Sequence, residues 1–304
     1  MHAFPGFLVY TKTFLSYVDE VNARGKGVVR IQVMGGPEAI KMFEQPNAVR
    51  DGVVDMVHTP GSFYGAAVPE IDAMVASTKN ATEARANGGT AMMDAAHQKR
   101  FNVKYLAWID SGVGFNIFTV NEPKFRSSDG VLDMSGVKMR DNPIYTAFLK
   151  SLEATTSPMP STEVYGALEK GVIDAAPWTT IGITELKWDK FLNYMVEPSF
   201  YSTDLGIIVN LDRWNGLSAE AKAILQDVAI EWEQKSHNDR KADISKYKAA
   251  YKEGGMDFVS HSDSGGANYL KLAYDSVWAR ATERMTDKGD GGDVAKLRAL
   301  YAPE

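Results

Sequence analysis

The sequence contains no cysteine among its 304 residues. Disulfide frameworks, thiolate nucleophiles and cysteine-based metal or iron–sulfur sites are therefore excluded. Histidine is scarce as well, with five in total, and no two of them form a His-x-x-x-His or His-Glu-x-x-His pair. Because such pairs carry many catalytic zinc sites, their absence argues against a zinc enzyme. Freedom from cysteine suits an oxidising compartment without establishing one.

Motifs of several other protein classes are also missing. No apolar run approaches the length of a membrane-spanning helix, so we expect a chain that does not itself span the membrane. Residues 1–7 lack the cationic region and apolar core of a signal peptide, which indicates a mature or truncated start. There is no Gly-x-Ser-x-Gly, Gly35-Gly36 is not part of a phosphate loop, and no nucleophile–base pair stands out.

Charge excludes one further partner. The formal net charge of −6 and the absence of a basic stripe argue against nucleic acid as a ligand. The composition, 44% hydrophobic and 24% charged, is that of an ordinary soluble globular protein. A chain of this length exceeds the usual domain size, so two domains with cores of their own are expected.

One short pattern occurs twice, more than a hundred residues apart. Residues 48–55 and 167–174 each read as a helical end, a glycine, a β-branched pair and an aspartate. A Gly-Val opening with an arginine close behind precedes each, at residues 27–30 and 136–140. The repetition predicts two α/β domains built on one plan. The aspartates at the matching positions then have a shared structural role, such as capping the next loop, and not a catalytic one.

Local periodicity predicts the other elements. The expected strands cover residues 28–34, 53–57, 105–109, 115–120, 136–140 and 205–210, the last as a crossing between domains. The expected helices cover residues 9–23, 38–51 with a break at Pro46, 82–101 and 144–152, and Ser161 or Thr162 caps a further helix. Alternating strands and helices favour largely parallel sheets with right-handed crossovers.

The longest predicted element lies at residues 218–253, which contain no proline or glycine. At the standard rise, such a helix would be about 50 Å long. Its first half is amphipathic, residues 235–241 are almost wholly polar, and apolar residues resume at Ile244. A helix buried at both ends and wet in the middle would bridge two lobes. The alternative is two helices joined by a frayed turn near Asn238.

Arg140 is the first candidate for a binding residue. Asp141-Asn142-Pro143 follows it, and the proline ends the strand there by forcing Asn142 out of helical geometry. A guanidinium at a strand end can hold a carboxylate through two parallel hydrogen bonds. The alternative is a surface ion pair with Asp141 or a neighbouring carboxylate.

Aromatic and hydroxyl side chains after the two repeated patterns are further candidates. Trp178 follows the second repeated pattern, in a loop after the strand, where it could form a pocket wall. The alternatives are packing within a lid or within the core. Ser62, Phe63 and Tyr64 occupy the equivalent loop of the first unit, from which they could line the other side of a clamshell. Taken alone, these three are ordinary turn residues.

The middle third of the chain resembles a known family. Four segments are similar to DctP-type solute receptors. They are Val137-Lys138-Met139-Arg140, the run from Pro158-Met159-Pro160-Ser161-Thr162 to Gly171-Val172-Ile173-Asp174, residues 49–56, and Trp214-x-x-Leu217-Ser218. These are the substrate-binding proteins of tripartite ATP-independent periplasmic (TRAP) transporters. The resemblance covers nearly the whole chain.

The resemblance implies an α/β fold of the two-lobed periplasmic-binding-protein type. Each lobe would hold a mixed, mostly parallel sheet flanked by helices, with a long helix spanning both lobes. We assign lobe I to residues 1–114 together with 206–236, and lobe II to residues 115–205 together with 237–304. The resemblance makes Arg140 the family's arginine for the ligand carboxylate. It also places ligand-binding positions at or near Trp178, Thr59, Ser62, Phe63, Tyr64, Asn116, Asn142, Ser161, Phe200 and Tyr201.

Three departures from the family pattern narrow the expectation. The chain begins roughly where the family's first strand should already have passed. Members that bind 2-oxo or 2-hydroxy acids through a metal carry Asp-Ala-x-Glu-Trp, but Pro177 stands here in place of the glutamate, which argues against a metal. Sialic-acid-type receptors have a second arginine near the position of Asn116, and its absence argues against that ligand.

The function implied is that of a periplasmic receptor without a cofactor. It would bind a small organic acid and deliver it to TRAP membrane subunits, one small and DctQ-like and one large and DctM-like. The aromatic candidates favour an acid with an apolar or ring body over a bare dicarboxylate. Two alternatives remain open: a ligand-sensing module for a partner other than a transporter, and a soluble α/β enzyme acting on a carboxylate.

Overall fold

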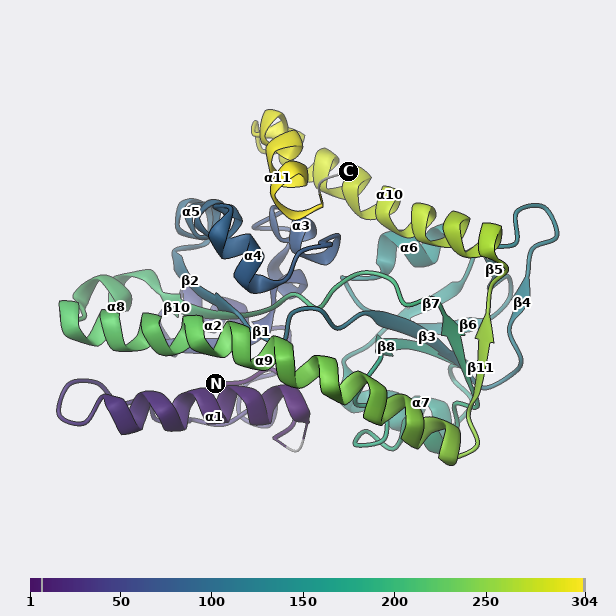
Figure 1. Cartoon of the computed structure of the whole chain (residues 1–304), viewed down its shortest axis with the longest axis horizontal. Coiled ribbons are helices and arrows are strands. Elements are labelled where there is room, and N and C mark those ends of the chain that lie inside the picture. Colours follow the sequence, from purple (N-terminus) through teal and green to yellow (C-terminus); the bar gives the residue numbers. More distant parts are fainter. Residues whose placement is uncertain (7, 303–304) are drawn as a thin grey trace.

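The computed structural model describes residues 1–6 and 8–302, which form two sheets with helices around them (Figure 1). The smaller sheet has the order β1-β10-β2, from β1 (Met56–Pro60), β10 (Leu205–Asn210) and β2 (Val103–Trp108). Both of its pairs are antiparallel, so the expectation of mostly parallel pairing is wrong for this sheet. The reason is that β10 enters from the other sheet and runs against both neighbours.

The larger sheet has the order β11-β9-β3-β8-β6-β7. It is mixed, because β3 runs antiparallel to β8 and β9 whereas β11–β9, β6–β7 and β6–β8 are parallel pairs. Strands β4 and β5 form a separate antiparallel pair. The bounds of these strands are β3 (Phe115–Thr119), β4 (Lys124–Phe125), β5 (Leu132–Asp133), β6 (Lys138–Asp141), β7 (Thr155–Pro158), β8 (Ala175–Thr179), β9 (Tyr194–Glu197) and β11 (Asp257–Ser260).

Helices cover both sheets, and two predicted helices differ from the observed ones. Residues 82–101 form two helices because Gly88, with φ of 93°, interrupts the helical backbone. Within residues 38–51 there is one short helix, which has Pro46 in its first turn. The helices are α1 (Val9–Arg24), α2 (Gln45–Arg50), α3 (Ile71–Val75), α4 (Ala81–Ala86), α5 (Gly89–Phe101), α6 (Thr146–Ser151), α7 (Ser161–Glu169), α8 (Leu211–Gly216), α9 (Ala219–Glu253), α10 (Asp263–Asp287) and α11 (Val294–Tyr301), with short 3₁₀ turns η1 (Gly61–Tyr64), η2 (Trp188–Lys190) and η3 (Gly291–Asp293).

Residues 28–34 do not form the predicted strand. They run without regular structure after a turn, and the Asn22 side chain takes up both backbone groups of Ile31, at 2.7 and 2.9 Å. No described strand pairs with them, so Val28, Val33 and Met34 stay 38%, 38% and 64% exposed. The β-branched pattern is typical of strands, but a strand also needs a neighbour to pair with.

The repeated pattern corresponds to one local structure that occurs twice. Gly52 and Gly171 both take positive φ, 73° and 64°, just after α2 and α7. The residues after the two glycines are Val53 and Val172. Their amides donate to the carbonyls of Ala48 and Ala167, five positions earlier, at 2.9 and 2.8 Å. The β-branched pair thus lies in the turn, and the strand begins only at Met56 or Ala175. Predicting the strand from residue 53 was therefore too early.

Four stretches of chain connect the two sheets. Residues 109–114 and 198–204 are the short ones, and α9 and α10 are the long ones (Figure 1). Helix α9 is continuous through Asn238, so the predicted long helix is confirmed and the alternative of two helices is wrong. The sequence reasoning did not foresee that α10, with 25 residues, also spans both lobes by packing on α6 and α3.

The C-terminal helix bears on the division into lobes. Helix α11 lies on α3 and α5, beside the smaller sheet, and the amide of Thr78 bonds to the carbonyl of Tyr301 at 2.9 Å. Assigning all of residues 237–304 to the second lobe therefore does not fit the end of the chain. The remaining predicted boundaries stay predictions.

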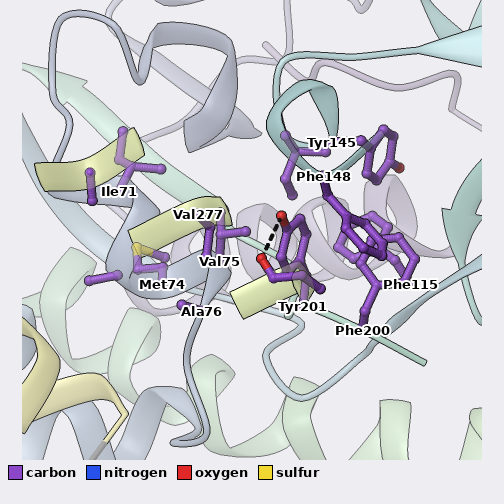
Figure 2. Packing of buried hydrophobic residues seen from close by; sticks show 14 of the residues in the cluster. Ile71, Met74, Val75, Ala76, Phe115, Tyr145, Phe148, Phe200, Tyr201 and Val277 are labelled. Carbon is purple, nitrogen blue, oxygen red and sulfur yellow. Dashed lines mark hydrogen bonds between the residues drawn. The ribbon is translucent and has the colours of Figure 1, made fainter. Parts of the chain in front are cut away.

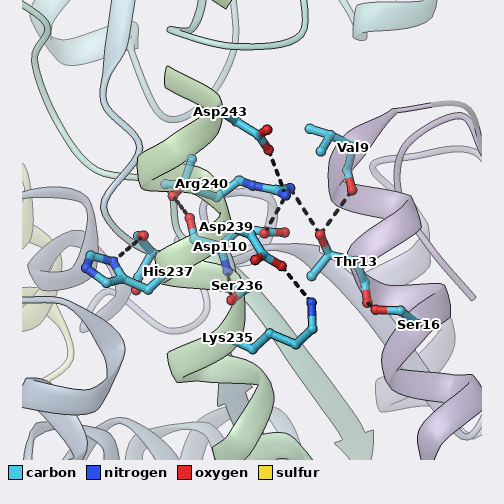
Figure 3. A network of polar contacts seen from close by, with 12 residues as sticks. Val9, Thr13, Ser16, Asp110, Lys235, Ser236, His237, Asp239, Arg240 and Asp243 are labelled. Carbon is cyan, nitrogen blue, oxygen red and sulfur yellow. Dashed lines mark hydrogen bonds and ion pairs between the residues drawn. The ribbon is translucent and has the colours of Figure 1, made fainter. Parts of the chain in front are cut away.

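The polar middle of α9 is wet on one face, where Lys235, Asn238 and Lys241 are exposed, but it is buried on the other (Figure 3). Ser236 and Arg240 are 1% and 6% exposed. The Ser236 hydroxyl accepts the amide hydrogen of Asp110, at 2.8 Å, and a guanidinium nitrogen of Arg240 lies 3.4 Å from the Asp110 carboxylate. Arg240 also contacts the Thr13 hydroxyl at 3.1 Å and Asp243 at 2.8 Å. These polar residues therefore anchor the connection at 109–114 to both α9 and α1.

A single apolar core crosses from one lobe to the other (Figure 2). Phe148 and Phe200 of the larger lobe pack with their ring centres 4.9 Å apart, next to Tyr201. Met74 of α3 and Val277 of α10 belong to the same buried cluster. Because this cluster is contiguous, the two lobes are in close contact beside the connecting segments.

Burial of Asp110 generates a prediction about pH. Burial raises the pKa of this carboxyl to about 7, against an ordinary 3.8, and Arg240 opposes the rise. The folded protein then holds a proton that the unfolded chain releases, so its free energy of unfolding falls as pH rises from about 4 to about 7. Asp110→Asn should remove this part of the slope, up to about 1.4 kcal/mol per pH unit.

Urea unfolding of both proteins across that pH range measures the difference, in which the contributions of all other titrating groups cancel. Asn suits the position because Asp110 has φ of 58°. Asp227→Asn, at an exposed position of α9, is the control and should follow the wild type. Parallel profiles of wild type and Asp110→Asn would contradict the assigned role.

Candidate functional site

A small cavity of about 30 Å³ lies where the two lobes meet. The end of β1 and the turn η1 form one side of it, and the ends of β6 and β8 form the other. Both short connections contribute, through Phe115, Thr203 and Asp204. Phe4 and Tyr10 reach it from the N-terminal part of the chain. This placement between two lobes is typical of a site for a small ligand, although in this closed form the space would admit only about one water.

Arg140 lies behind the wall of this cavity and does not line it. The side chain is buried, at 1% exposure, and its guanidinium carbon is 5.8 Å from the ring centre of Tyr145 and 5.4 Å from that of Trp178. Both of those residues do line the cavity. The arginine donates to the backbone carbonyls of Met159, at 3.3 Å, and Pro177, at 3.2 Å.

The charge of Arg140 has no counter-ion within the described residues. Asp141 is buried too, but its carboxylate accepts from the Asn142 amide and the Thr146 hydroxyl. The alternative of a surface ion pair is therefore wrong. Burial lowers the pKa of the Arg140 guanidinium, with Tyr145 and Asp141 opposing this shift. An arginine has five N–H donors, so the two carbonyls leave some free for an anion.

Trp178 lies within β8, opposite Asn116, and not in a loop after the strand as predicted. Its ring lines the cavity and meets Trp188 and Phe4 edge-on, at 5.1 and 5.8 Å between ring centres. The indole nitrogen is buried and has no hydrogen-bond partner among the residues described.

Three more predicted residues line the cavity. The hydroxyl of Ser62 is buried and has no partner within residues 1–6 and 8–302, and Phe63 packs edge-on against Phe43 at 4.7 Å. The side-chain oxygen of Asn142 accepts the amide hydrogen of Ile144, at 3.2 Å. The structure thus brings Ser62 and Phe63 of one lobe together with Asn142 and Trp178 of the other.

Other predicted residues lie away from the cavity lining. Tyr64 stacks on Phe101 at 4.9 Å and bonds to His97 at 3.0 Å, within the first lobe. Thr59 is fully buried in β1. The side-chain amide of Asn116 donates to the carbonyl of Val196, at 2.8 Å, and accepts from the Thr180 hydroxyl, at 2.7 Å. It therefore links neighbouring segments of the larger sheet.

The remaining three predicted residues also face protein. Ser161 is the first residue of α7, yet Pro160 holds the cap position and no side chain caps the helix. Phe200 is fully buried in the aromatic core, and the Tyr201 hydroxyl donates to the carbonyl of Ala273 at 3.1 Å. Phe200 and Tyr201 are close in sequence to Thr203 of the lining, but their side chains pack into the protein. The Ser161 hydroxyl is buried and has no hydrogen-bond partner within the described residues.

Sequence reasoning missed several charged or polar residues at the cavity, of which Asp204 and Tyr145 bear most on the site; the others are Tyr10, Thr179 and Thr203. Asp204 is 2% exposed, and its carboxylate accepts the amide hydrogen of Ser62 at 2.6 Å. Burial raises the pKa of Asp204 to about 6, with the Ser62 hydrogen bonds opposing the shift. Tyr145 stands between Arg140 and the cavity. The available signals were an acid directly before the apolar strand at 205–210 and an aromatic shortly after Asn142.

Two further features of the described chain bear on its class. No group of three or more His, Asp or Glu side chains there is arranged to hold a metal ion. No helix in that part is long and apolar enough to cross a membrane. The backbone carbonyl of Pro177, the residue that replaces the family's glutamate, accepts its hydrogen bond from Arg140.

Replacing Arg140 and Arg280 by methionine should change the free energy of unfolding by different amounts. Arg280 forms a buried bidentate pair with Asp72, at 2.7 and 3.0 Å, so Arg280→Met should cost about 3 kcal/mol by leaving that carboxylate with only Arg284, 3.6 Å away. Arg140→Met loses two long hydrogen bonds of about 1 kcal/mol each, but it also removes a buried charge that lacks a counter-ion. We expect the second variant to be about as stable as the wild type.

Urea unfolding of the ligand-free proteins measures both effects. A loss for Arg140→Met as large as that for Arg280→Met would mean that Arg140 serves the fold and is not held ready for a ligand.

Comparison with known proteins shows the family of the chain. Residues 5–283 match the model of the DctP family, described as bacterial extracellular solute-binding protein, family 7. A solute-binding protein from Albidiferax ferrireducens is 24% identical over 322 residues, covering 98% of this chain and 89% of that one.

Two solved structures share the fold. A Bordetella pertussis extracytoplasmic solute receptor that binds pyroglutamic acid superposes with a TM-score of 0.81 at 18% identity, over 99% of this chain and 97% of that one. A TRAP periplasmic solute-binding protein from Rhodoferax ferrireducens, with bound malonate, gives 0.79 at 21% identity, over 98% and 95%. The predicted two-lobed α/β fold is confirmed. On the strength of the family match, the chain belongs to the bacterial extracellular solute-binding protein family 7, the DctP family.

Proposed function

We propose that this protein is the extracytoplasmic receptor of a TRAP transporter and that it binds a small organic acid through Arg140. The observation that carries this proposal is the buried guanidinium behind Tyr145 and Trp178, which has no carboxylate partner in the described part of the chain. Burying a charge without a counter-ion is expensive unless a bound group compensates it. A ligand carboxylate would supply that compensation and form two parallel hydrogen bonds.

The cavity explains how the acid would be enclosed. Its walls come from both lobes, so opening would expose the site to solvent and closing would remove the ligand from water. The ligand would stabilise the closed form because only that form brings Ser62 and Trp178 to the same cavity. The short connections at 109–114 and 198–204 are the segments that would have to bend.

The lining favours an acid with an apolar or ring body. Phe4, Phe63, Phe115 and Trp178 all border the cavity. Flat apolar walls suit a ring and offer little to a chain with a charge at each end. The pyroglutamic acid of the Bordetella receptor is a ligand of that kind.

Delivery would involve two membrane subunits, one small and DctQ-like and one large and DctM-like. The family description, extracellular solute-binding protein, supports a location outside the cytoplasm, for which we propose the periplasm. Closure changes the surface formed by the two lobes, and that changed surface would be what the membrane subunits recognise.

Loss of the guanidinium tests the proposal. A panel of monocarboxylic acids with ring bodies, together with malonate, is titrated against the wild type by thermal shift and calorimetry. Arg140→Ala should weaken binding of the best acid by about a hundredfold or more, because removing one partner of a desolvated charge pair costs about 2–5 kcal/mol. Arg140→Lys should recover only part of it, since an ammonium lacks the planar fork.

Arg213→Ala, an exposed arginine on α8 with 69% of its side chain accessible, is the matched control and should bind normally. Binding to Arg140→Ala within a few-fold of the wild type would contradict the assignment. Uptake into vesicles that carry the two membrane subunits, with the acid recovered unchanged, separates a transport receptor from a sensor or an enzyme.

A further inference from the structure

We propose that Asp204 is a second recognition residue and that the ligand is a ring-bodied acid carrying an N–H donor, of the lactam or ammonium type. The inference rests on the proposed function, because it assumes that Arg140 receives the carboxylate. It adds the chemistry of the opposite end of the ligand.

Asp204 is a buried carboxylate placed on the cavity. It lines the cavity at the start of β10 and is only 2% exposed. Its carboxylate accepts the amide hydrogen of Ser62 at 2.6 Å, and it forms no ion pair among residues 1–6 and 8–302. A carboxylate has about four acceptor positions, so it can accept further hydrogen bonds from a ligand.

The other buried aspartates of this region have different partners, although neither carboxylate oxygen of Asp110 has a hydrogen-bond partner in the described chain. Asp72 holds Arg280 with two hydrogen bonds, and Asp110 lies 3.4 Å from Arg240. The Asp141 carboxylate accepts from an amide and from a hydroxyl. Asp204 differs from Asp72 and Asp110 in lacking a cation and from all three in bordering the cavity.

The two incompletely paired charges belong to different walls. Asp204 and Ser62 stand on the side of the smaller sheet, whereas Arg140 is held on β6 of the larger sheet, behind Tyr145 and Trp178. A ligand between them meets a cation at one end and an anion at the other. An N–H group beside Asp204 would add a charge-assisted hydrogen bond, while a second carboxylate would meet an uncompensated like charge.

Donor side chains at the cavity add to the specificity. The lining includes Tyr10, Ser62 and Trp178, whose side chains carry O–H and N–H groups. They can serve a carbonyl or carboxylate oxygen of the ligand. Asp204, as a carboxylate, is an acceptor only. The arrangement therefore fits an acid with a donor at one defined position and acceptors elsewhere.

Exchanging one atom of the ligand tests the inference. The lactam 5-oxopyrrolidine-2-carboxylate and the lactone 5-oxotetrahydrofuran-2-carboxylate differ only by N–H against ring oxygen. Pyrrolidine-2-carboxylate and tetrahydrofuran-2-carboxylate form a second pair, in which the nitrogen carries a positive charge. Calorimetry at neutral pH should show the N–H member of at least one pair binding about tenfold or more tighter than its oxygen partner, because the lactone leaves a buried carboxylate unpaired.

The variant Asp204→Asn should reduce that preference to within about threefold, as the charge-assisted bond is lost. Asp110→Asn is the matched control: it removes another buried aspartate, which does not line the cavity, and should keep the preference. The comparison within the wild type needs no variant, so poor folding of Asp204→Asn would not prevent the test.

Each outcome is decisive. Equal affinities within both pairs, tighter binding of the oxygen members, or binding of neither N–H acid at millimolar concentration would overturn the inference. If acids without nitrogen bind tightly and need Arg140, the role of Asp204 fails while the proposed function stands. If binding of every acid is independent of Arg140, the proposed function itself fails.

Discussion

A charge removed from water needs a partner, and this constraint accounts for most of the structure near the lobe boundary. Two buried pairs, Asp72 with Arg280 and Asp110 with Arg240, obey it within the protein and join segments that are distant in sequence. Arg140 and Asp204 do not obey it within the described chain. The first group stabilises the fold, and the second group is what a ligand would complete. The same chemistry thus separates structural residues from recognition residues.

The backbone places these side chains through the connecting segments. Asp110 and Asp204 both lie at the ends of the short connections, where the chain passes between the sheets. Helices α9 and α10 run alongside as long supports, and they carry Arg240 and Arg280 to meet Asp110 and Asp72 (Figure 1). Charged groups are therefore concentrated where any relative movement of the lobes must occur.

Local patterns in the sequence predicted what local interactions determine. The glycine turns after α2 and α7, the length of α9 and the strand that ends at Arg140 all follow from neighbouring residues. Pairing between distant segments was not accessible in this way. Residues 28–34 have strand composition but no partner, and α10 was missed because Gly265 and Gly266 in its first turn conceal the helix. Asp204 resembled an ordinary residue before a strand until Ser62, far away in sequence, was found beside it.

The family resemblance predicted site residues that periodicity could not, because it carries information about contacts between distant segments. It identified Arg140, Trp178 and Asn142, whose common location depends on tertiary structure. It was less useful for Tyr64, Asn116 and Phe200, which are near the cavity in sequence while their side chains face protein. A neighbouring position along a strand or turn points to the opposite side, so a shift of one residue exchanges a ligand contact for a core contact.

The path of the chain has a consequence for how the protein folds. Because it passes between the sheets at 109–114, at 198–204, through α9 and again through α10, each lobe is assembled from separate pieces of sequence (Figure 1). Neither lobe is a contiguous module that could be cut out, expressed alone or exchanged with a relative at a single junction. The apolar cluster shared by both lobes adds to this interdependence. Unfolding should accordingly be cooperative across the whole chain, with both lobes lost together.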